Sequence, residues 1–84
     1  MPTKSVLYTR TAATALRKHA NRASLTRSKI IQYAEDASSQ TNNVKPLVGV
    51  DAKRLRVGDF RVIFTETADI ITILDIGPRG GIYE

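Results

Sequence analysis

Three arginines in the second half of the sequence, Arg54, Arg56 and Arg61, have the spacing of an anion-binding site. They flank Gly58-Asp59, which signals a two-residue β-hairpin turn because glycine reaches positive φ without cost and aspartate tolerates it. Closing the hairpin there places Arg56 directly opposite Arg61, where two like charges repel each other. A fold that keeps this pair is expected to bind an anion between the two guanidinium groups.

The same turn sorts the hairpin side chains onto two faces, because alternate residues of a strand point to opposite sides of a sheet. The predicted register also pairs Val57 with Phe60, Leu55 with Val62 and Lys53 with Phe64. One face is then apolar and consists of Leu55, Val57, Phe60, Val62 and Phe64. The other carries the three arginines and is expected to be open to solvent. In a second interpretation, which stays open, these arginines form a solvated face that only deters edge-to-edge aggregation.

Before the hairpin, the sequence predicts one strand and two helices. The strand is expected at Lys4–Thr9. The first helix is alanine-rich and is expected from Ala12 to about Ala20. The hydroxyl of Thr9 or Thr11 would cap its start, and Asn21-Arg22 would mark its end. The second helix is expected from about Leu25 to Ser38, with Ser24 as its cap. Its apolar face would consist of Ile30, Ile31, Ala34 and Ala37.

The second half predicts a loop and three strands. Polar residues from Ser38 to Val44 indicate a loop, which Pro46 and Gly49 extend. The strands are expected at Ala52–Val57, Phe60–Thr67 and Asp69–Gly77. The expected order is therefore β-α-α-β-β-β, an α+β fold in which an antiparallel helical hairpin covers one face of a three-stranded antiparallel meander. Residues 1–84 are expected to form one domain.

The net charge of +5 comes from the N-terminal half of the chain. Residues 1–44 hold seven basic and two acidic side chains, whereas residues 45–84 hold six of each. A basic surface attracts nucleic acid or an acidic protein. A merely soluble cationic surface is the alternative. The single histidine, His19, lies between charged residues and is expected to be a solvated helix residue.

Composition excludes several classes of chemistry. There is no cysteine, so neither a disulfide framework nor thiolate chemistry is available. No cluster of histidine, cysteine or aspartate has the spacing of metal ligands, so no metal and no cofactor are expected. The longest apolar run is too short to span a bilayer, and the N-terminus lacks the apolar core of a secretory signal. A cytoplasmic location without membrane contact is expected.

Three segments in order resemble motifs of one known family. They are the loop Lys45-Pro46-Leu47-Val48-Gly49, the hairpin from Lys53 to Phe64, and Ile76-Gly77-Pro78-Arg79 followed by Ile82-Tyr83. Together they are similar to the RelE/ParE toxin superfamily, the small toxins of type II toxin–antitoxin pairs. The resemblance covers essentially the whole chain. It implies a cognate antitoxin as partner, with a heterotetramer of toxin and antitoxin as one expected assembly.

The resemblance also implies a function and a set of site residues. RelE-like members are ribosome-dependent endoribonucleases that cut mRNA in the ribosomal A site, so the ribosome and mRNA are expected partners. The catalytic positions of the family fall on Arg54, where a lysine is frequent, and on Arg61, Arg79 and Tyr83. The expected RNA-binding residues are Lys53, Arg56, Arg17, Lys18, Arg22, Arg27 and Lys29.

This chain departs from the family pattern at the residues that would move protons. Arginine in place of the lysine cannot transfer a proton near neutral pH. Tyr83 has an ordinary pKa near ~10, which neighbouring arginines would lower by favouring the phenolate. Gly80-Gly81 replaces a charged spacer, and no terminal helix is expected after Tyr83. Tyr83 as a terminal or core residue remains the alternative.

The function predicted from the sequence is therefore a ribosome-dependent endoribonuclease toxin. The arginines would hold the scissile phosphate and the dianionic phosphorane, because guanidinium groups bind phosphate oxygens in pairs. Two alternatives stay open: a ParE-like inhibitor of DNA gyrase without nuclease activity, and an inactive member that only binds its antitoxin or nucleic acid.

Overall fold

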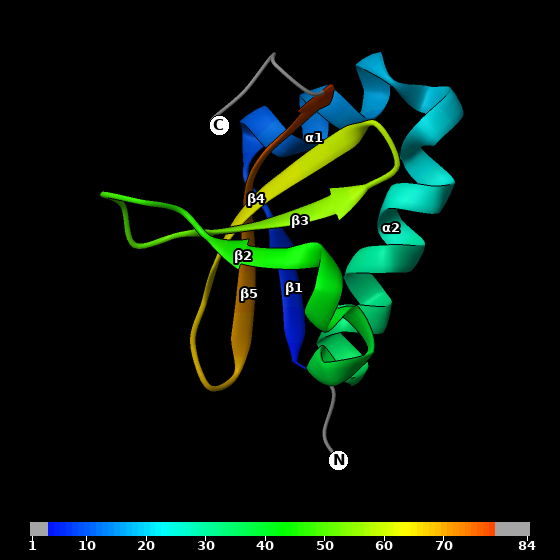
Figure 1. Ribbon diagram of the computed structural model, residues 1–84. Helices are drawn as coiled ribbons and strands as arrows, with labels where there is room; N and C mark the ends of the chain where they lie inside the picture. Colours follow the sequence, from blue (N-terminus) through cyan, green and yellow to red (C-terminus); the bar gives the residue numbers. More distant parts are fainter. Residues whose placement is uncertain (1–3, 79–84) are drawn as a thin grey trace.

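Two α-helices lie against one face of a five-stranded mixed sheet in the computed structural model, which describes residues 4–78 (Figure 1). The helices are α1 (Arg10–Lys18) and α2 (Ala20–Glu35), followed by a 3-10 segment, η1 (Ala37–Asn43). The strands are β1 (Ser5–Tyr8), β2 (Val44–Pro46), β3 (Lys53–Val57), β4 (Phe60–Glu66) and β5 (Ile70–Pro78). Their order in the sheet is β1-β5-β4-β3-β2. The α+β class predicted from the sequence is confirmed.

The sheet contains one strand that the sequence analysis did not predict. Residues 44–46 were expected to be irregular, but they form β2, which pairs antiparallel with β3. Pro46 has no N–H to donate, and a proline is tolerated in β2 because this strand lies at the edge of the sheet. At the opposite edge, β1 pairs parallel with β5.

Thr9, one of the two predicted caps, is the N-cap of α1. The Thr9 hydroxyl accepts a hydrogen bond from Ala12 N (3.2 Å) and donates one to Leu74 O (3.0 Å). Thr9 therefore stabilises the first turn of α1 and also joins this helix to β5.

The predicted boundary between the helices was wrong. Only His19 separates α1 from α2, so Asn21-Arg22 and Ser24 lie inside α2 instead of ending one helix and capping the next. His19 has non-helical backbone angles (φ −112°, ψ 51°), and the helix resumes at once at Ala20. On α2, Ile30 and Ala34 are buried as predicted, whereas Ile31 is 49% exposed. Ala37 lies in η1 and is exposed.

The predicted hairpin register is confirmed in every pair. Val57 lies opposite Phe60, Arg56 opposite Arg61, and Leu55 opposite Val62. Gly58 has φ +58°, whereas Asp59, like every other described residue that is not glycine, has no positive φ. A positive φ at the first turn residue alone is the pattern of a type II′ turn. The turn thereby fixes which hairpin residues face the helices.

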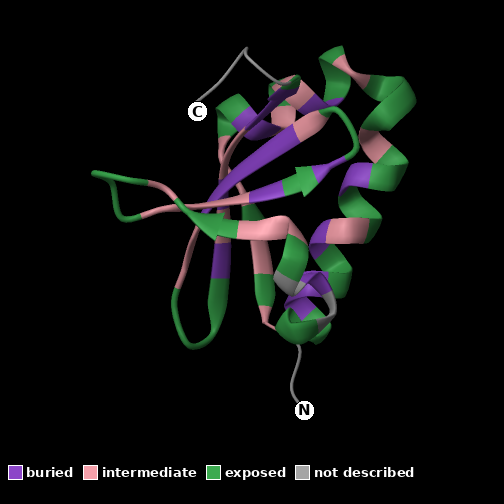
Figure 2. Cartoon of the chain, viewed as in Figure 1, coloured by how far each residue is buried: buried purple, intermediate pink, exposed green. Residues whose placement is uncertain are grey.

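The core lies between the helices and the apolar face of the sheet. Figure 2 shows the buried residues concentrated on the central strands and on the inner sides of the helices. The largest side chain with under 2% exposure is Phe64, whose ring packs 5.2 Å from the ring of Tyr33. A β-bulge interrupts the pairing of β4 with β5: Ile63 lies opposite Asp75 and Phe64 opposite Ile73, so Leu74 has no partner in β4.

Candidate functional site

The sheet face opposite the helices carries two like-charged pairs, one beside the other. Arg56 of β3 lies opposite Arg61 of β4, as the sequence predicted. Lys45 of β2 lies opposite Arg54 of β3, and the sequence analysis missed this pair because it did not expect β2. A single alternation of an apolar with a charged residue, Val44 then Lys45, is too short a pattern to predict a strand.

This arginine face, defined by Lys45, Arg54, Arg56 and Arg61, is less open than predicted. Arg56 is exposed and Arg54 is half-buried, but Arg61 is only 4% exposed. Arg61 belongs to the central strand β4, between Arg56 and Gly77, and Gly77 has no side chain to hold it away from the sheet. Ile63, which is 1% exposed and stands outside the main core cluster, adds an apolar residue near Arg61. The expectation of a uniformly solvent-open face was therefore wrong at β4.

The basic groups at the edge of this face have no acidic partner. Within residues 4–78, Lys45, Arg54 and Arg56 form no ion pair with an aspartate or a glutamate. Like charges held opposite each other on a sheet are unfavourable. An anion bound between them would relieve this repulsion, and guanidinium groups are suited to bind the oxygens of a phosphate in pairs.

Two of the predicted catalytic residues, Arg79 and Tyr83, lie outside the described residues. The described chain ends at Pro78, which lies opposite Phe60, beside the pair that Gly77 forms with Arg61. The last described residue is therefore at the same end of the sheet as Arg56 and Arg61.

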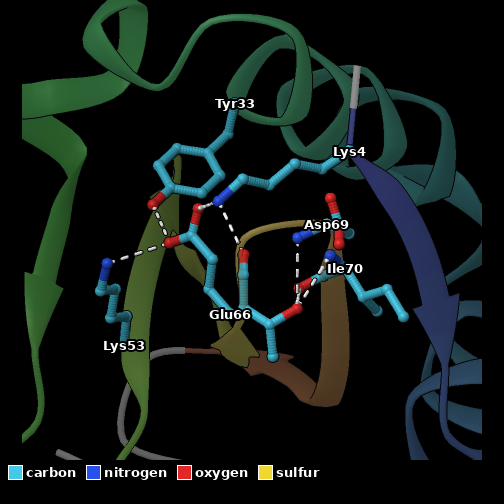
Figure 3. Close-up of polar contacts among 7 residues, drawn as sticks. Lys4, Tyr33, Lys53, Glu66, Asp69 and Ile70 are labelled. Carbon is cyan, nitrogen blue, oxygen red and sulfur yellow. Dashed lines mark hydrogen bonds and ion pairs between the residues drawn. The ribbon is translucent and has the colours of Figure 1, made fainter. Parts of the chain in front are cut away.

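Lys53 is not brought together with the arginines. It lies opposite Phe64, on the side of the sheet that the helices cover, and its ammonium group donates to Glu66 Oε1 (2.9 Å). Figure 3 shows this pair together with two further donors to Glu66. The structure thus gives Lys53 a partner inside the domain, while its predicted role in RNA binding stays a prediction.

Glu66 is the centre of a cluster that the sequence analysis did not find. Lys4 Nζ donates to Glu66 Oε2 (2.5 Å), and the Tyr33 hydroxyl donates to Oε1 (2.6 Å), alongside Lys53 (Figure 3). Burial by itself would raise the pKa of Glu66, but these three hydrogen bonds and the charge of Lys53 outweigh it and lower the pKa to about 2. Glu66 is thus a charged, structural carboxylate in β4 that joins this strand to α2, to β3 and to the residue before β1.

The two described tyrosines are poor candidates for the base that the proposed chemistry needs. Burial, the hydrogen bond to Glu66 and the negative charge of Glu66 all raise the pKa of Tyr33. Burial also raises the pKa of Tyr8, although the charge of Arg27 partly opposes this. Both side chains therefore stay protonated at neutral pH, so neither supplies a phenolate.

The predicted RNA-binding residues on the helices form a separate basic surface. Arg17, Lys18, Arg22 and Arg27 are exposed and Lys29 is half-buried. Within residues 4–78, none of the five forms an ion pair with an acidic side chain. Their charge is therefore available to a partner.

His19 is not the solvated helix residue that was expected. Its ring packs edge-on against Phe60 with 4.9 Å between centroids, and the side chain is half-buried. The Arg22 guanidinium lies 6.0 Å from the centroid of the same Phe60 ring. The break between α1 and α2 thereby packs against the start of β4.

Other kinds of site find no support in the part of the chain that the structure describes. Among residues 4–78, no group of three histidine, aspartate or glutamate side chains could hold a metal ion. None of the described helices is long and apolar enough to cross a membrane.

Comparison with known proteins identifies the fold. No protein-family model matches the sequence, and no curated protein matches it significantly. Three solved structures share the architecture over nearly the whole chain. The first belongs to the archaeal RelE–RelB complex from Pyrococcus horikoshii OT3, with a TM-score of 0.76, 24% identity and coverage of 96% of this chain and 100% of that chain.

The other two come from bacteria. The toxin–antitoxin complex RelBE2 from Mycobacterium tuberculosis gives a TM-score of 0.67 at 23% identity, covering 93% of this chain and 100% of that chain. The E. coli DinJ–YafQ toxin–antitoxin complex gives a TM-score of 0.77 at 11% identity, covering 99% and 100%. The chain therefore has the fold found in these complexes, in agreement with the resemblance that its motifs predicted.

Proposed function

We propose that this chain is the toxin of a type II toxin–antitoxin pair and that it cleaves mRNA in the ribosomal A site. The observation that carries this proposal is the arginine face: two like-charged pairs, Lys45 with Arg54 and Arg56 with Arg61, on the sheet surface that the helices leave free. The fold shared with the RelE–RelB and DinJ–YafQ complexes supports the assignment to a toxin.

The reaction that this surface could support is attack of a ribose 2′-OH on the adjacent phosphorus. The new bond joins O2′ to phosphorus, the bond from phosphorus to O5′ breaks, and a 2′,3′-cyclic phosphate forms. Arg54, Arg56 and Arg61 would hold the phosphate and stabilise the dianionic phosphorane, with Arg79 as a further donor. A base takes the 2′ proton and an acid protonates O5′. We assign the removal of the 2′ proton to Tyr83 as a phenolate, since Tyr8 and Tyr33 are held in the protonated form. The Tyr83 hydroxyl formed in this way, or a water molecule, then supplies the proton that O5′ takes up.

The basic residues of the helices would serve binding instead of chemistry. We propose that Arg17, Lys18, Arg22, Arg27 and Lys29 bind ribosomal RNA phosphates and position the toxin. Each bound phosphate releases counterions, so replacing three of these residues should lower the slope of log affinity against log salt by about one for each phosphate that is no longer bound. An unchanged slope would argue against a ribosomal role and for an antitoxin surface.

The expected partner is an acidic, largely disordered antitoxin that folds as it binds. Within the described residues, β1 and β2 each have one unpaired edge, to which a partner strand could add. Acidic side chains of the same partner would neutralise the arginine face. The cytoplasm is the expected location of this pair and of its ribosomal target.

A cell-free translation reaction tests the proposed activity. The wild-type chain should stop translation and produce cuts in ribosome-bound mRNA, which primer extension maps. Arg61→Ala and Arg56→Ala should each lower cleavage at least tenfold, because removing one hydrogen-bond donor to the charged transition state costs about 2 kcal/mol or more. Arg10→Gln removes an exposed charge from the start of α1 and is the matched control.

Two outcomes would overturn the nuclease assignment. One is full activity of both arginine variants at equal concentration. The other is intact mRNA together with inhibition of DNA supercoiling, which would make the chain a gyrase inhibitor of the ParE kind.

A further inference from the structure

We propose that a small hollow beside the arginine face, lined by Asn42, Asn43, Lys45, Arg54 and Arg56, binds the RNA phosphate next to the scissile one. The proposal rests on the proposed function and adds three residues to it: Lys45 and the two asparagines. The volume of the hollow is about 50 Å³, which suits a single small polar group.

The hollow is built where η1 runs into β2. Val44 lies opposite Leu55 and Lys45 opposite Arg54, so Asn43, one residue earlier, is placed beside Arg56. The strand pairing therefore brings the Asn43 amide next to Arg56, and Asn42 completes the lining of the hollow. Because β2 is an edge strand, the hollow opens at the border of the sheet and not in its centre.

The charge of the hollow favours an anion. Lys45 and Arg56 are exposed, Arg54 is half-buried, and none of the three has an acidic partner within residues 4–78. Arg54 and Arg56 stand two residues apart on β3, which corresponds to about 6.6 to 6.8 Å along a strand. This separation is similar to that of successive phosphates in a nucleic acid chain. One phosphate could thus lie between Arg56 and Arg61 and the next between Arg54 and Lys45.

The asparagines favour RNA over an acidic peptide as the source of the anion. Asn43 Nδ2 donates to Gln40 Oε1 (3.1 Å), and Gln40 Nε2 donates in turn to Gln32 Oε1 (2.9 Å) on α2. Since Gln40 is only 4% exposed, this chain of amides fixes Asn43. Its Oδ1 remains an acceptor with no hydrogen bond among the described residues. A carboxylate has no proton for such an acceptor, whereas the 2′-OH of a ribonucleotide does.

Binding of a short single-stranded RNA by the full chain tests the proposal. Fluorescence anisotropy at several salt concentrations should show that Lys45→Gln weakens binding about tenfold at low salt and lowers the salt slope by about 0.7, the value for one phosphate of a single strand. Arg10→Gln should leave both quantities unchanged. Lys45→Arg should restore them, and circular dichroism should show equal thermal unfolding of all variants.

Modified RNA then locates the interaction. A neutral methylphosphonate at the phosphate bound by Lys45 should weaken binding to the wild-type chain, but it should have little further effect on Lys45→Gln, because both changes remove one interaction. Asn43→Ala should reduce the preference for RNA over DNA of the same sequence. Absence of coupling at every linkage would overturn the proposal.

The remaining outcomes separate this inference from the proposed function. If wild type and Lys45→Gln bind RNA equally while the wild type still cuts mRNA, the hollow is not an RNA subsite and the nuclease assignment stands. If Lys45→Gln weakens only antitoxin binding, the hollow is a peptide site and the inference fails. If the wild type neither binds RNA nor cuts mRNA, both proposals fail.

Discussion

Replacing Glu66 with glutamine should remove most of the dependence of stability on acidic pH. The carboxylate accepts hydrogen bonds from Lys4, Tyr33 and Lys53 and its side chain is only 10% exposed. Its pKa is lowered from 4.5 to about 2 in the folded chain. Stability from a lowered carboxylate pKa is fully present above the unfolded value and is lost as pH falls through the folded value. The window is therefore about pH 4.5 to 2.

The size of the effect follows from the pKa and from the exposure of the partners. A pKa lowered from 4.5 to about 2 corresponds to at most about 3 kcal/mol of unfolding free energy at pH 7. The side chains of Lys4 and Lys53 are 29% and 44% exposed, so water screens both ion pairs. About 2 kcal/mol is the better expectation. For a domain of this size, this corresponds to a fall in Tm of roughly 8 to 16 °C in Glu66→Gln at neutral pH.

Urea unfolding followed by circular dichroism between pH 7 and pH 3 measures this directly. The wild type should lose more than half of the Glu66 contribution by pH 3, whereas Glu66→Gln should lack that part of the decline. Glu35→Gln is the matched control, because Glu35 is exposed and has no polar partner among the described residues. If the Glu66 and Glu35 variants have the same dependence on pH, the cluster does not stabilise the fold.

Three further predictions concern single side chains. Thr9→Ala should cost about 1 to 2 kcal/mol in urea unfolding, because it removes the cap of α1 and the bond to Leu74, whereas Thr11→Ala should be nearly neutral. In a spectrophotometric titration of the folded chain, Tyr33→Phe should remove no phenolate signal below about pH 11, since the pKa of Tyr33 is raised; a lost signal would contradict the geometry at Glu66. Gly58→Ala should cost about 1 to 2 kcal/mol in the same unfolding assay through backbone strain alone, because φ is +58° and a Cβ there meets no atom within 4 Å.

The hairpin could be predicted in full because its signals are local. Gly58-Asp59 identifies the turn, and the alternation from Leu55 to Phe64, which only Ile63 interrupts, then favours the one register that places Leu55, Val62 and Phe64 on one face. The boundaries of β3 and β4 follow from the same two signals to within one residue.

Other parts of the fold depend on interactions that no local pattern records. The break at His19 involves neither glycine nor proline, and β2 is three residues long and contains a proline. Lys4, Tyr33 and Lys53 lie 62, 33 and 13 residues from Glu66, so their meeting could not be predicted from spacing. The burial of Arg61 likewise depends on its central position in the sheet, which is a tertiary property.

The alternation of side chains between the two faces of β5 is interrupted at Leu74, the residue that the bulge leaves without a partner in β4. Ile71 and Ile73 face the core two residues apart, but Ile76 does so three residues later. Deleting Leu74 would therefore restore strict alternation, with Ile76 two residues after Ile73 and still facing the core. Keeping Leu74 but pairing the strand without the bulge would instead turn Ile76 to the arginine side and Gly77 to the core. Deleting one residue from the connection between β2 and β3 would only shorten a loop. If one protein has this bulge and a second does not, an alignment of their β5 strands without a gap places residues from opposite faces of the sheet in the same column. Leu74 thus determines which face of the sheet each later residue of β5 occupies, including Gly77, which lies opposite Arg61.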